Sequence, residues 1–234
     1  MPYYDVLHHD GDNYTIVEGY RAGRNLRERQ ALKGDAYEVR MLTILRHAAK
    51  GLAQLHNMNR CHGNVQPSTI LLDNDGRAAL ADYSLACDGN KQRSGWTPLF
   101  LQRTEWAAPE ESAEAASVSE AADIYALGCI GYWLLSGEPP FPGTPERQTL
   151  QHAGAERPDV RTLAAGVSEI TAKTLLKAMQ VEPAERYPHA HAFIHSLERN
   201  LDLLAQPQFD TEARIRGELS GAQAVSSFSL QEPD

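Results

Sequence analysis

A polar segment followed by two short apolar runs constrains the fold of this chain more than any other feature. Residues 61–69 are mostly polar, and residues 70–72 and 78–81 are apolar, with Asp-Asn-Asp-Gly between the two runs. Short apolar strands joined by a turn of Asn, Asp and Gly are typical of a β-hairpin. Such a hairpin brings the polar residues on its two flanks, 62–69 and 82–84, together at its open end. The sequence therefore predicts a cleft lined by these polar side chains.

The same stretch resembles the catalytic loop and the metal-binding loop of eukaryotic-type serine/threonine protein kinases. In that family the pattern His-Arg-Asp-Leu-Lys-Pro-Glu-Asn is followed by a strand pair and by Asp-Phe-Gly. The first Asp is the catalytic base, and the Asn and the later Asp hold magnesium. His62 and Pro67 keep their family positions, Asp82 keeps the position of the metal-binding Asp, and Gly63 stands where the family has Arg. The resemblance implies that His62 has a structural role and braces the loop.

Three positions that carry the family's chemistry differ in this chain. Asn64 stands in place of the catalytic Asp, Gln66 in place of the Lys, and Thr69 in place of the magnesium-binding Asn. An amide has no useful basicity near neutral pH, so Asn64 cannot act as a base. Gln66 carries no charge to balance a migrating phosphoryl group, and Asp82 alone is poor support for magnesium. With these substitutions the resemblance predicts a degenerate kinase, a catalytically inactive pseudokinase and not an enzyme, with no catalytic residue, no cofactor and no metal site.

Further positions match structural motifs of the kinase family. Residues 106–110, Trp-Ala-Ala-Pro-Glu, match the family's Ala-Pro-Glu anchor, and residues 182–187 resemble the stretch with the Arg that pairs with that Glu. The resemblance predicts a buried, charge-assisted pair between Glu110 and Arg186. It also implies that Asp123, at the start of an apolar helix, holds the backbone of the catalytic loop.

The N-terminal part of the chain predicts a strand. Residues 14–20 are rich in β-branched and aromatic side chains, and in the resemblance they form the hinge strand between the two kinase lobes, with residues 23–27 beginning a helix after it. No Lys occurs before Lys33, and no glycine-rich phosphate loop precedes the hinge. We therefore expect a kinase-like large lobe over residues 14–204, with the N-terminal lobe missing.

Apolar and amphipathic stretches predict the helices of that lobe. Apolar residues recur at three- and four-residue steps in most of them, and the central stretch is apolar nearly all round. The expected helices cover residues 35–55, 123–135, 167–180 and 189–204. The fold class is accordingly mainly α (α+β), a helical domain like the kinase C-terminal lobe with a small β-hairpin. A polar segment, 1–13, precedes this domain, and a flexible tail, 205–234, follows it.

The charge balance and the composition exclude several kinds of partner. The formal net charge of −9 argues against a nucleic-acid surface, where a basic patch is expected. No apolar run approaches the length of a transmembrane helix, and the N-terminus lacks a signal sequence. The three cysteines lie far apart, without the paired spacing of zinc or redox sites. We expect a cytoplasmic protein that binds no nucleic acid and does not insert into a membrane.

Three functions remain open from the sequence. The first is an inactive pseudokinase domain that acts as a protein-binding scaffold or regulatory module. The second is a divergent or split protein kinase that binds ATP once a partner chain supplies the N-terminal lobe, and the third is a structural regulatory domain cut from a longer parent. For the first we expect a protein partner, or self-association, through the face left open by the missing lobe, around Tyr14, Ile16, Val17 and Leu72. An exposed strand edge and an uncovered apolar patch both favour association.

Overall fold

The computed structural model describes eight segments of the chain: residues 3–8, 14–18, 24–28, 37–82, 87–88, 104–111, 118–154 and 156–206. Contacts along the backbone group the chain into one compact unit that ends at Leu201 and a second that begins at Asp202. Apart from the end of the last helix, every strand and helix of the described residues belongs to the first unit.

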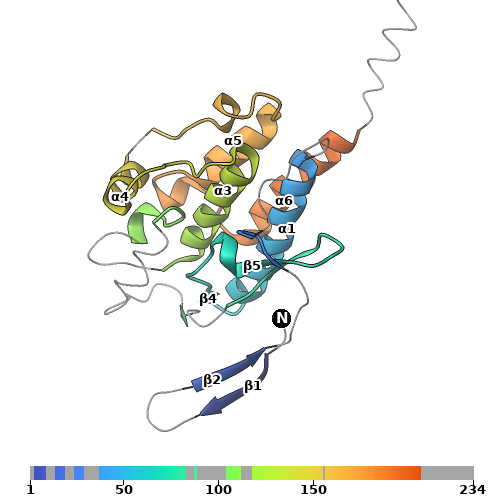
Figure 1. The fold of residues 1–234 in the computed structure, drawn as a ribbon, viewed down its shortest axis with the longest axis vertical. Helices are drawn as coiled ribbons and strands as arrows, with labels where there is room; N and C mark the ends of the chain where they lie inside the picture. Colours follow the sequence, from blue (N-terminus) through green and yellow to red (C-terminus); the bar gives the residue numbers. More distant parts are fainter. Residues whose placement is uncertain are drawn as a thin grey trace, which may run out of the picture. The chain divides into compact units, whose positions relative to one another are not determined.

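The described fold is mainly helical, with small antiparallel sheets, as the sequence predicted (Figure 1). The helices are α1 (Tyr37–His56), α3 (Glu120–Ser136), α4 (Pro145–Ala153), α5 (Glu169–Ala178) and α6 (Ala190–Ala205). The four predicted helices coincide with α1, α3, α5 and α6 to within three residues at each end. Helix α4 was not predicted, although Thr144 caps it and Pro145 occupies its first position, which is a common way to start a helix.

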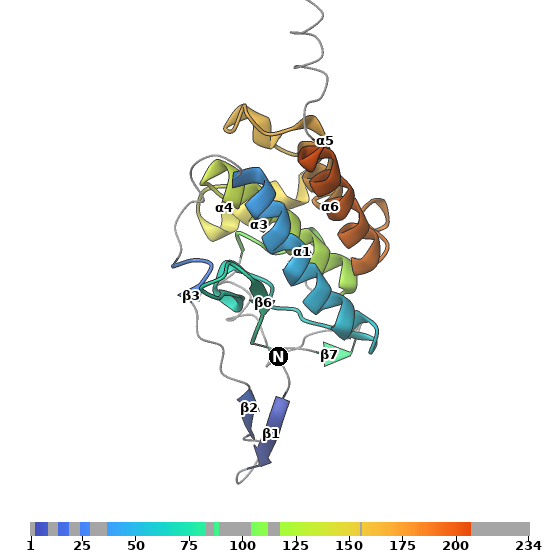
Figure 2. The ribbon, with the colours of Figure 1, turned by 90° about the vertical axis from the view of Figure 1, so that its right-hand side faces the viewer.

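Among the described helices α3 is the most buried, as expected from its nearly uniform apolar sequence. Of its 17 residues 13 are buried, against 11 of 20 in α1. Its N-terminus is capped by the Ser119 hydroxyl, which accepts a hydrogen bond from the Ala122 N–H, and Gly137 ends it in the left-handed conformation (φ 83°). It contacts both α1 and α5, which lie on different sides of it (Figures 1 and 2). This helix therefore forms the centre of the core.

The close approach of α3 to its neighbours depends on Gly131. A Cβ atom at this position would lie 2.6 Å from Leu175 Cδ2 on α5 and 2.8 Å from Leu45 Cδ1 on α1. Both distances are too short for carbon atoms in contact. The glycine thus allows three helices to pack closely at this point.

The predicted hairpin over 70–81 is present as β5 (Ile70–Leu72) and β6 (Ala78–Leu80). Its turn contains Gly76 at φ 77°, and the Asp73 carboxylate accepts hydrogen bonds from the N–H groups of Asp75 and Arg77. These are the conformations and side-chain contacts that Gly and Asp favour in turns. The local sequence is therefore sufficient to fix this element.

A third strand, β3 (Arg24–Asn25), pairs antiparallel with β5, where residues 23–27 had been expected to begin a helix. The N–H of Leu26 donates to the carbonyls of Pro67 and Ile70, at 3.0 and 2.7 Å. The Asn25 side chain accepts from the N–H of Glu28 and closes a turn. Pairing with β5 therefore takes the place of the predicted helix start.

This pairing also corrects the predicted binding face. Leu72 was expected to lie uncovered, but it is 2% exposed and pairs with Arg24 of β3. A substitution at Leu72 would therefore disturb the core and would not report on a free surface.

The predicted strand at 14–20 is present as β2 (Tyr14–Glu18). It forms an antiparallel hairpin with β1 (Tyr3–His8), a strand that the sequence analysis did not anticipate. A second small pair joins β4 (Arg60–Cys61) to β7 (Cys87–Asp88). One edge of the proposed hinge strand is thus occupied by β1.

No helix in the described ranges combines the length and the hydrophobicity that crossing a bilayer requires. The part of the predicted tail beyond residue 206 lies outside the described residues.

Candidate active site

Asp123 holds the loop that resembles the kinase catalytic loop. Its carboxylate accepts hydrogen bonds from the N–H groups of His62 and Gly63, each at 2.8 Å, and contacts His56 Nε2 at 3.1 Å. Gly63 adopts a left-handed backbone conformation with φ 66°, which glycine tolerates without strain. The rigid start of α3 therefore fixes the position of the loop, as the resemblance implied.

The environment of Asp123 keeps its carboxyl ionised. Burial by itself would raise its pKa, but the hydrogen bond from His56, the nearby His62 and the Gly63 N–H outweigh burial, and the pKa of Asp123 is lowered. A charged acceptor forms stronger hydrogen bonds to backbone N–H groups than a neutral one. The fully buried carboxylate therefore anchors the loop over the whole neutral pH range.

His62 braces the loop through both ring nitrogens. Its Nε2 lies 3.0 Å from the carbonyl oxygen of Ala81, and its Nδ1 accepts a hydrogen bond from the N–H of Asn64 at 3.2 Å. These contacts together fit the neutral ring with its proton on Nε2. His62 thereby links the loop to the residue just before Asp82.

Asn64, Gln66 and Asp82 form one hydrogen-bonded network. The Asn64 amide donates to Asp82 Oδ2 at 3.0 Å, and the Gln66 amide donates to Asn64 Oδ1 at 3.0 Å. Asn64 is 8% exposed, whereas Asp82 is exposed. The structure thus brings together three of the four predicted positions, with the Asn64 amide fixed in orientation by a neighbour on each side.

Thr69 is turned into the loop and away from this network. It is 3% exposed, and its hydroxyl accepts from the Gln66 N–H and lies 3.0 Å from the carbonyl oxygens of Asn64 and Gln66. The hydroxyl closes the start of the short 3-10 helix Pro67–Thr69. Thr69 therefore stabilises the loop, and its hydroxyl is not available to a ligand beside Asp82.

Asp82 is the residue best suited to hold a magnesium ion. Magnesium in nucleotide sites is bound by one or two carboxylates together with phosphate oxygens and water. Asp82 is exposed, and its φ of 62° is an uncommon conformation for a residue other than glycine, of a kind that clusters at functional sites. Among the described residues, no cluster of three or more His, Cys, Asp or Glu side chains could bind a metal ion without such help. The site therefore fits magnesium only if phosphate groups supply most of the ligands.

Glu110 and Arg186 form a two-pronged ion pair. Arg186 Nη1 and Nη2 donate to Glu110 Oε1 and Oε2, each at 2.7 Å, and the Arg186 side chain is fully buried. Arg186 also donates to the carbonyls of Gln180, Ala121 and Val181. The structure thus brings together the two predicted partners, which lie 76 positions apart in the sequence.

His56 also belongs to this site, although its contact with Asp123 was not predicted. It lies at the end of α1, and its ring contacts Asp123 directly. Its position just before the loop was visible in the sequence, but no local pattern connects it to a residue on α3.

The protein kinase domain family matches residues 2–197 of the chain. The serine/threonine-protein kinase PrkC of Bacillus subtilis is 29% identical over 80% of this chain and 29% of that protein. The serine/threonine-protein kinase PknL of Mycobacterium tuberculosis is 28% identical over 87% of this chain and 51% of that protein. The DNA damage-responsive serine/threonine-protein kinase RqkA of Deinococcus radiodurans is 31% identical over 68% of this chain and 24% of that protein. The chain thus spans about half or less of the length of these relatives.

The expectation that the chain is not an enzyme is therefore wrong. The kinase domain match over residues 2–197 and the similarity to several serine/threonine kinases over most of the chain, though distant, contradict that expectation. The prediction relied on the combined substitutions at Asn64, Gln66 and Thr69, with Asp82 as the remaining metal ligand. Phosphoryl transfer depends mainly on positioning and electrostatic stabilisation, so substitutions at these positions do not by themselves decide whether an enzyme is present.

Proposed function

Because the chain belongs to the protein kinase family, we propose that it is part of a divergent serine/threonine protein kinase that transfers the terminal phosphoryl group of ATP to protein hydroxyls. The nucleotide-gripping elements come from a partner chain or from residues beyond this sequence. The observation that carries the proposal is the loop at 62–66, held by Asp123 so that Asn64 lies beside Asp82.

At this site Asp82 would supply charge, and Asn64 and Gln66 would supply positioning. Asp82 is the residue that would hold magnesium, and the ion would neutralise charge on the phosphate oxygens. Asn64 does not take up a proton, so its role is to hold Asp82 and to orient the acceptor hydroxyl by hydrogen bonding. Gln66 fixes the Asn64 amide at 3.0 Å. Transfer by this site then rests on positioning without a general base, and the proton of the acceptor hydroxyl passes to an oxygen of the transferred phosphoryl group as the bond to ADP breaks.

The absence of a base at Asn64 sets the expected rate. General acid–base catalysis contributes roughly 10²- to 10⁴-fold, so Asn64→Asp should accelerate transfer by a factor of that order. Asp82→Asn, which removes the metal ligand, should abolish transfer. Wild type, Asn64→Asp and Asp82→Asn are each expressed in the organism of origin and isolated under mild conditions, so that any chain supplying the small lobe is retained. Transfer of radioactive phosphate from ATP is then measured for each of them. Equal background signals from wild type, Asn64→Asp and Asp82→Asn would refute the proposal.

A second candidate function is protein binding as a scaffold or regulatory module. It is favoured by the hydrogen bonds that connect Asn64, Gln66 and Asp82 to one another, because they compete with contacts to a substrate. The partner would be another protein or a second copy of the chain, docked near β2 on the face that a small lobe would cover.

Nucleotide binding and solution mass discriminate between these functions. A kinase requires saturable binding of ATP with magnesium, which a thermal-shift titration detects, and a binding module does not. For the module, light scattering should show association that Ile16→Asp weakens. Leu163→Asp, at an apolar position that is 56% exposed, serves as the control and should leave the mass unchanged. A monomeric wild type, with partner capture unaffected by Ile16→Asp, would eliminate this candidate.

A further inference from the structure

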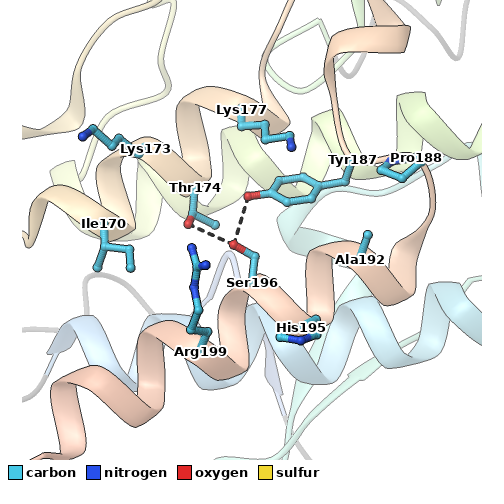
Figure 3. A pocket seen from close by; sticks show the side chains of 10 residues that line it. All are labelled: Ile170, Lys173, Thr174, Lys177, Tyr187, Pro188, Ala192, His195, Ser196 and Arg199. Atoms are coloured by element: carbon cyan, nitrogen blue, oxygen red, sulfur yellow. Dashed lines mark hydrogen bonds between the residues drawn. The ribbon is translucent and has the colours of Figure 1, made fainter.

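We propose that a groove between α5 and α6 binds an acidic, extended peptide segment of another protein. The groove has a volume of about 500 Å³, which lies in the range of ligand-binding sites. Its walls come from the two helices and from the segment at Tyr187 and Pro188 that joins them (Figure 3). None of these elements contributes to the network around Asp82.

The rim of the groove is basic although the chain is acidic. Lys173 and Lys177 line it from α5, and Arg199 lines it from α6, against a formal net charge of −9 for the whole chain. Lys173 forms an exposed ion pair with Glu169 at 2.6 Å. No carboxylate in the described part of the chain pairs with Lys177 or Arg199. The groove therefore presents positive charge that the described fold does not neutralise.

Tyr187 orients one of these cations over the groove. The Lys177 ammonium lies 4.8 Å from the centroid of the Tyr187 ring, a cation–π contact. Figure 3 shows the Arg199 guanidinium extending from α6 toward Thr174, on the opposite wall. An acidic group in the groove can therefore meet cations from both helices.

The floor of the groove offers a hydrogen-bond donor. The Tyr187 hydroxyl donates to Ser196 Oγ at 3.1 Å, and Ser196 Oγ lies 3.3 Å from Thr174 Oγ1, which also accepts from the Asn200 amide (Figure 3). The hydroxyls of Tyr187, Ser196 and Thr174 carry three protons, and the two hydrogen bonds among these hydroxyls use two of them. Whichever way the Ser196–Thr174 bond runs, one proton has no acceptor among the described residues. A carboxylate, which only accepts hydrogen bonds, matches this donor.

The spacing of the cations favours an extended peptide over a single small anion. Lys173 and Lys177 are four residues apart on a helix, a separation of about 6 Å along its axis. Alternate residues of an extended chain are about 6.6–6.8 Å apart, so carboxylates at alternate positions can face both lysines. Ile170 and Ala192 supply apolar contact for the residues between them. Exposed ion pairs are weak, so a peptide carboxylate can replace Glu169 beside Lys173.

The test measures binding of a fluorescently labelled heptapeptide in which three glutamates alternate with alanines. Fluorescence anisotropy at low salt should show saturable binding that weakens as salt increases. Lys177→Glu combined with Arg199→Glu should weaken binding at least tenfold, by about 1.4 kcal/mol or more. Arg147→Glu reverses an exposed charge on α4 and should leave the affinity unchanged. Circular dichroism checks folding, and Lys177→Gln with Arg199→Gln replaces the double reversal if that variant does not fold.

The controls separate peptide recognition from charge alone. An isomeric peptide with its three glutamates adjacent, and a peptide with lysine in place of glutamate, should both bind more weakly. The proposal would be overturned by the absence of saturable binding, by an equal loss in Arg147→Glu, or by displacement of the peptide by millimolar sulfate but not by chloride at the same ionic strength. Asp82→Asn should bind the peptide as wild type does, so the result does not depend on the proposed kinase activity.

Discussion

The ion pair between Glu110 and Arg186 should be among the most stabilising polar contacts of the fold, and its removal can be predicted in detail. Arg186 is fully buried and Glu110 is 20% exposed. Removing one partner of a buried pair costs roughly 3–5 kcal/mol, because the other charge is left without its partner. We expect Glu110→Ala to lie near the lower end of this range. In that variant Arg186 keeps three backbone carbonyls and its contact with the Tyr125 ring, at 4.7 Å.

Arg186→Ala should cost more than Glu110→Ala. It removes three hydrogen bonds to part-buried backbone carbonyls, and partly unsatisfied groups of this kind cost up to about 1–3 kcal/mol each, although water entering the cavity would reduce that loss. The free energy of unfolding is measured by urea denaturation followed by circular dichroism. The double variant should be more stable than the sum of the single losses predicts, with a coupling of roughly 0.5–3 kcal/mol.

Arg161 provides the matched control for this experiment. It also forms a two-pronged pair, with Asp159, but both side chains are substantially exposed, 41% and 32%. Exposed pairs contribute about 0–1 kcal/mol, so Arg161→Ala should have little effect. The reasoning would be wrong if the losses of unfolding free energy for Glu110→Ala and Arg186→Ala were additive. It would also be wrong if Arg186→Ala lost no more unfolding free energy than Arg161→Ala.

Three further variants test the core and the loop anchor. Asp123→Asn should destabilise the fold by about 1–3 kcal/mol in thermal or urea unfolding, because an amide nitrogen facing a loop N–H leaves a buried donor unpaired; an unchanged stability would contradict the anchoring role. Gly131→Ala should cost about 1–3 kcal/mol, since its Cβ would meet Leu175 Cδ2 at 2.6 Å, and a neutral result would mean that the helices can separate. Burial and the neighbouring Arg157 lower the pKa of His152 to about 4, from an ordinary value of 6.5. The unfolded chain therefore takes up this proton first as the pH falls, and stability should decrease between pH 6.5 and pH 4 by up to roughly 3 kcal/mol. His152→Gln should flatten this part of the curve, and an identical pH dependence in both proteins would contradict the assignment.

The sequence by itself determined the elements whose pattern is local. The hairpin β5–β6 follows from two short apolar runs around a turn with Asp73 and Gly76. Helix α1 follows from apolar residues at helical spacing, and α3 from an apolar sequence with a Ser cap and a Gly end. Most backbone hydrogen bonds of each of these elements lie within the element, so nearby residues go far toward specifying it. The resemblance to kinase motifs also identified the loop at 62–69 and the two members of the Glu110–Arg186 pair.

Only the tertiary structure decided which groups meet. Residues 24–25 form a strand because β5 offers them a pairing edge, where the kinase resemblance implied a helix start. Thr69 turns inward because its hydroxyl can close the loop, and Asn64 meets Asp82 because the hairpin and Asp123 place both at one end of the sheet. These contacts join residues that lie far apart along the chain or depend on the path of the backbone between them. Periodicity indicates which side of an element is buried, but it does not identify the partner, which is set by close packing among elements distant in sequence.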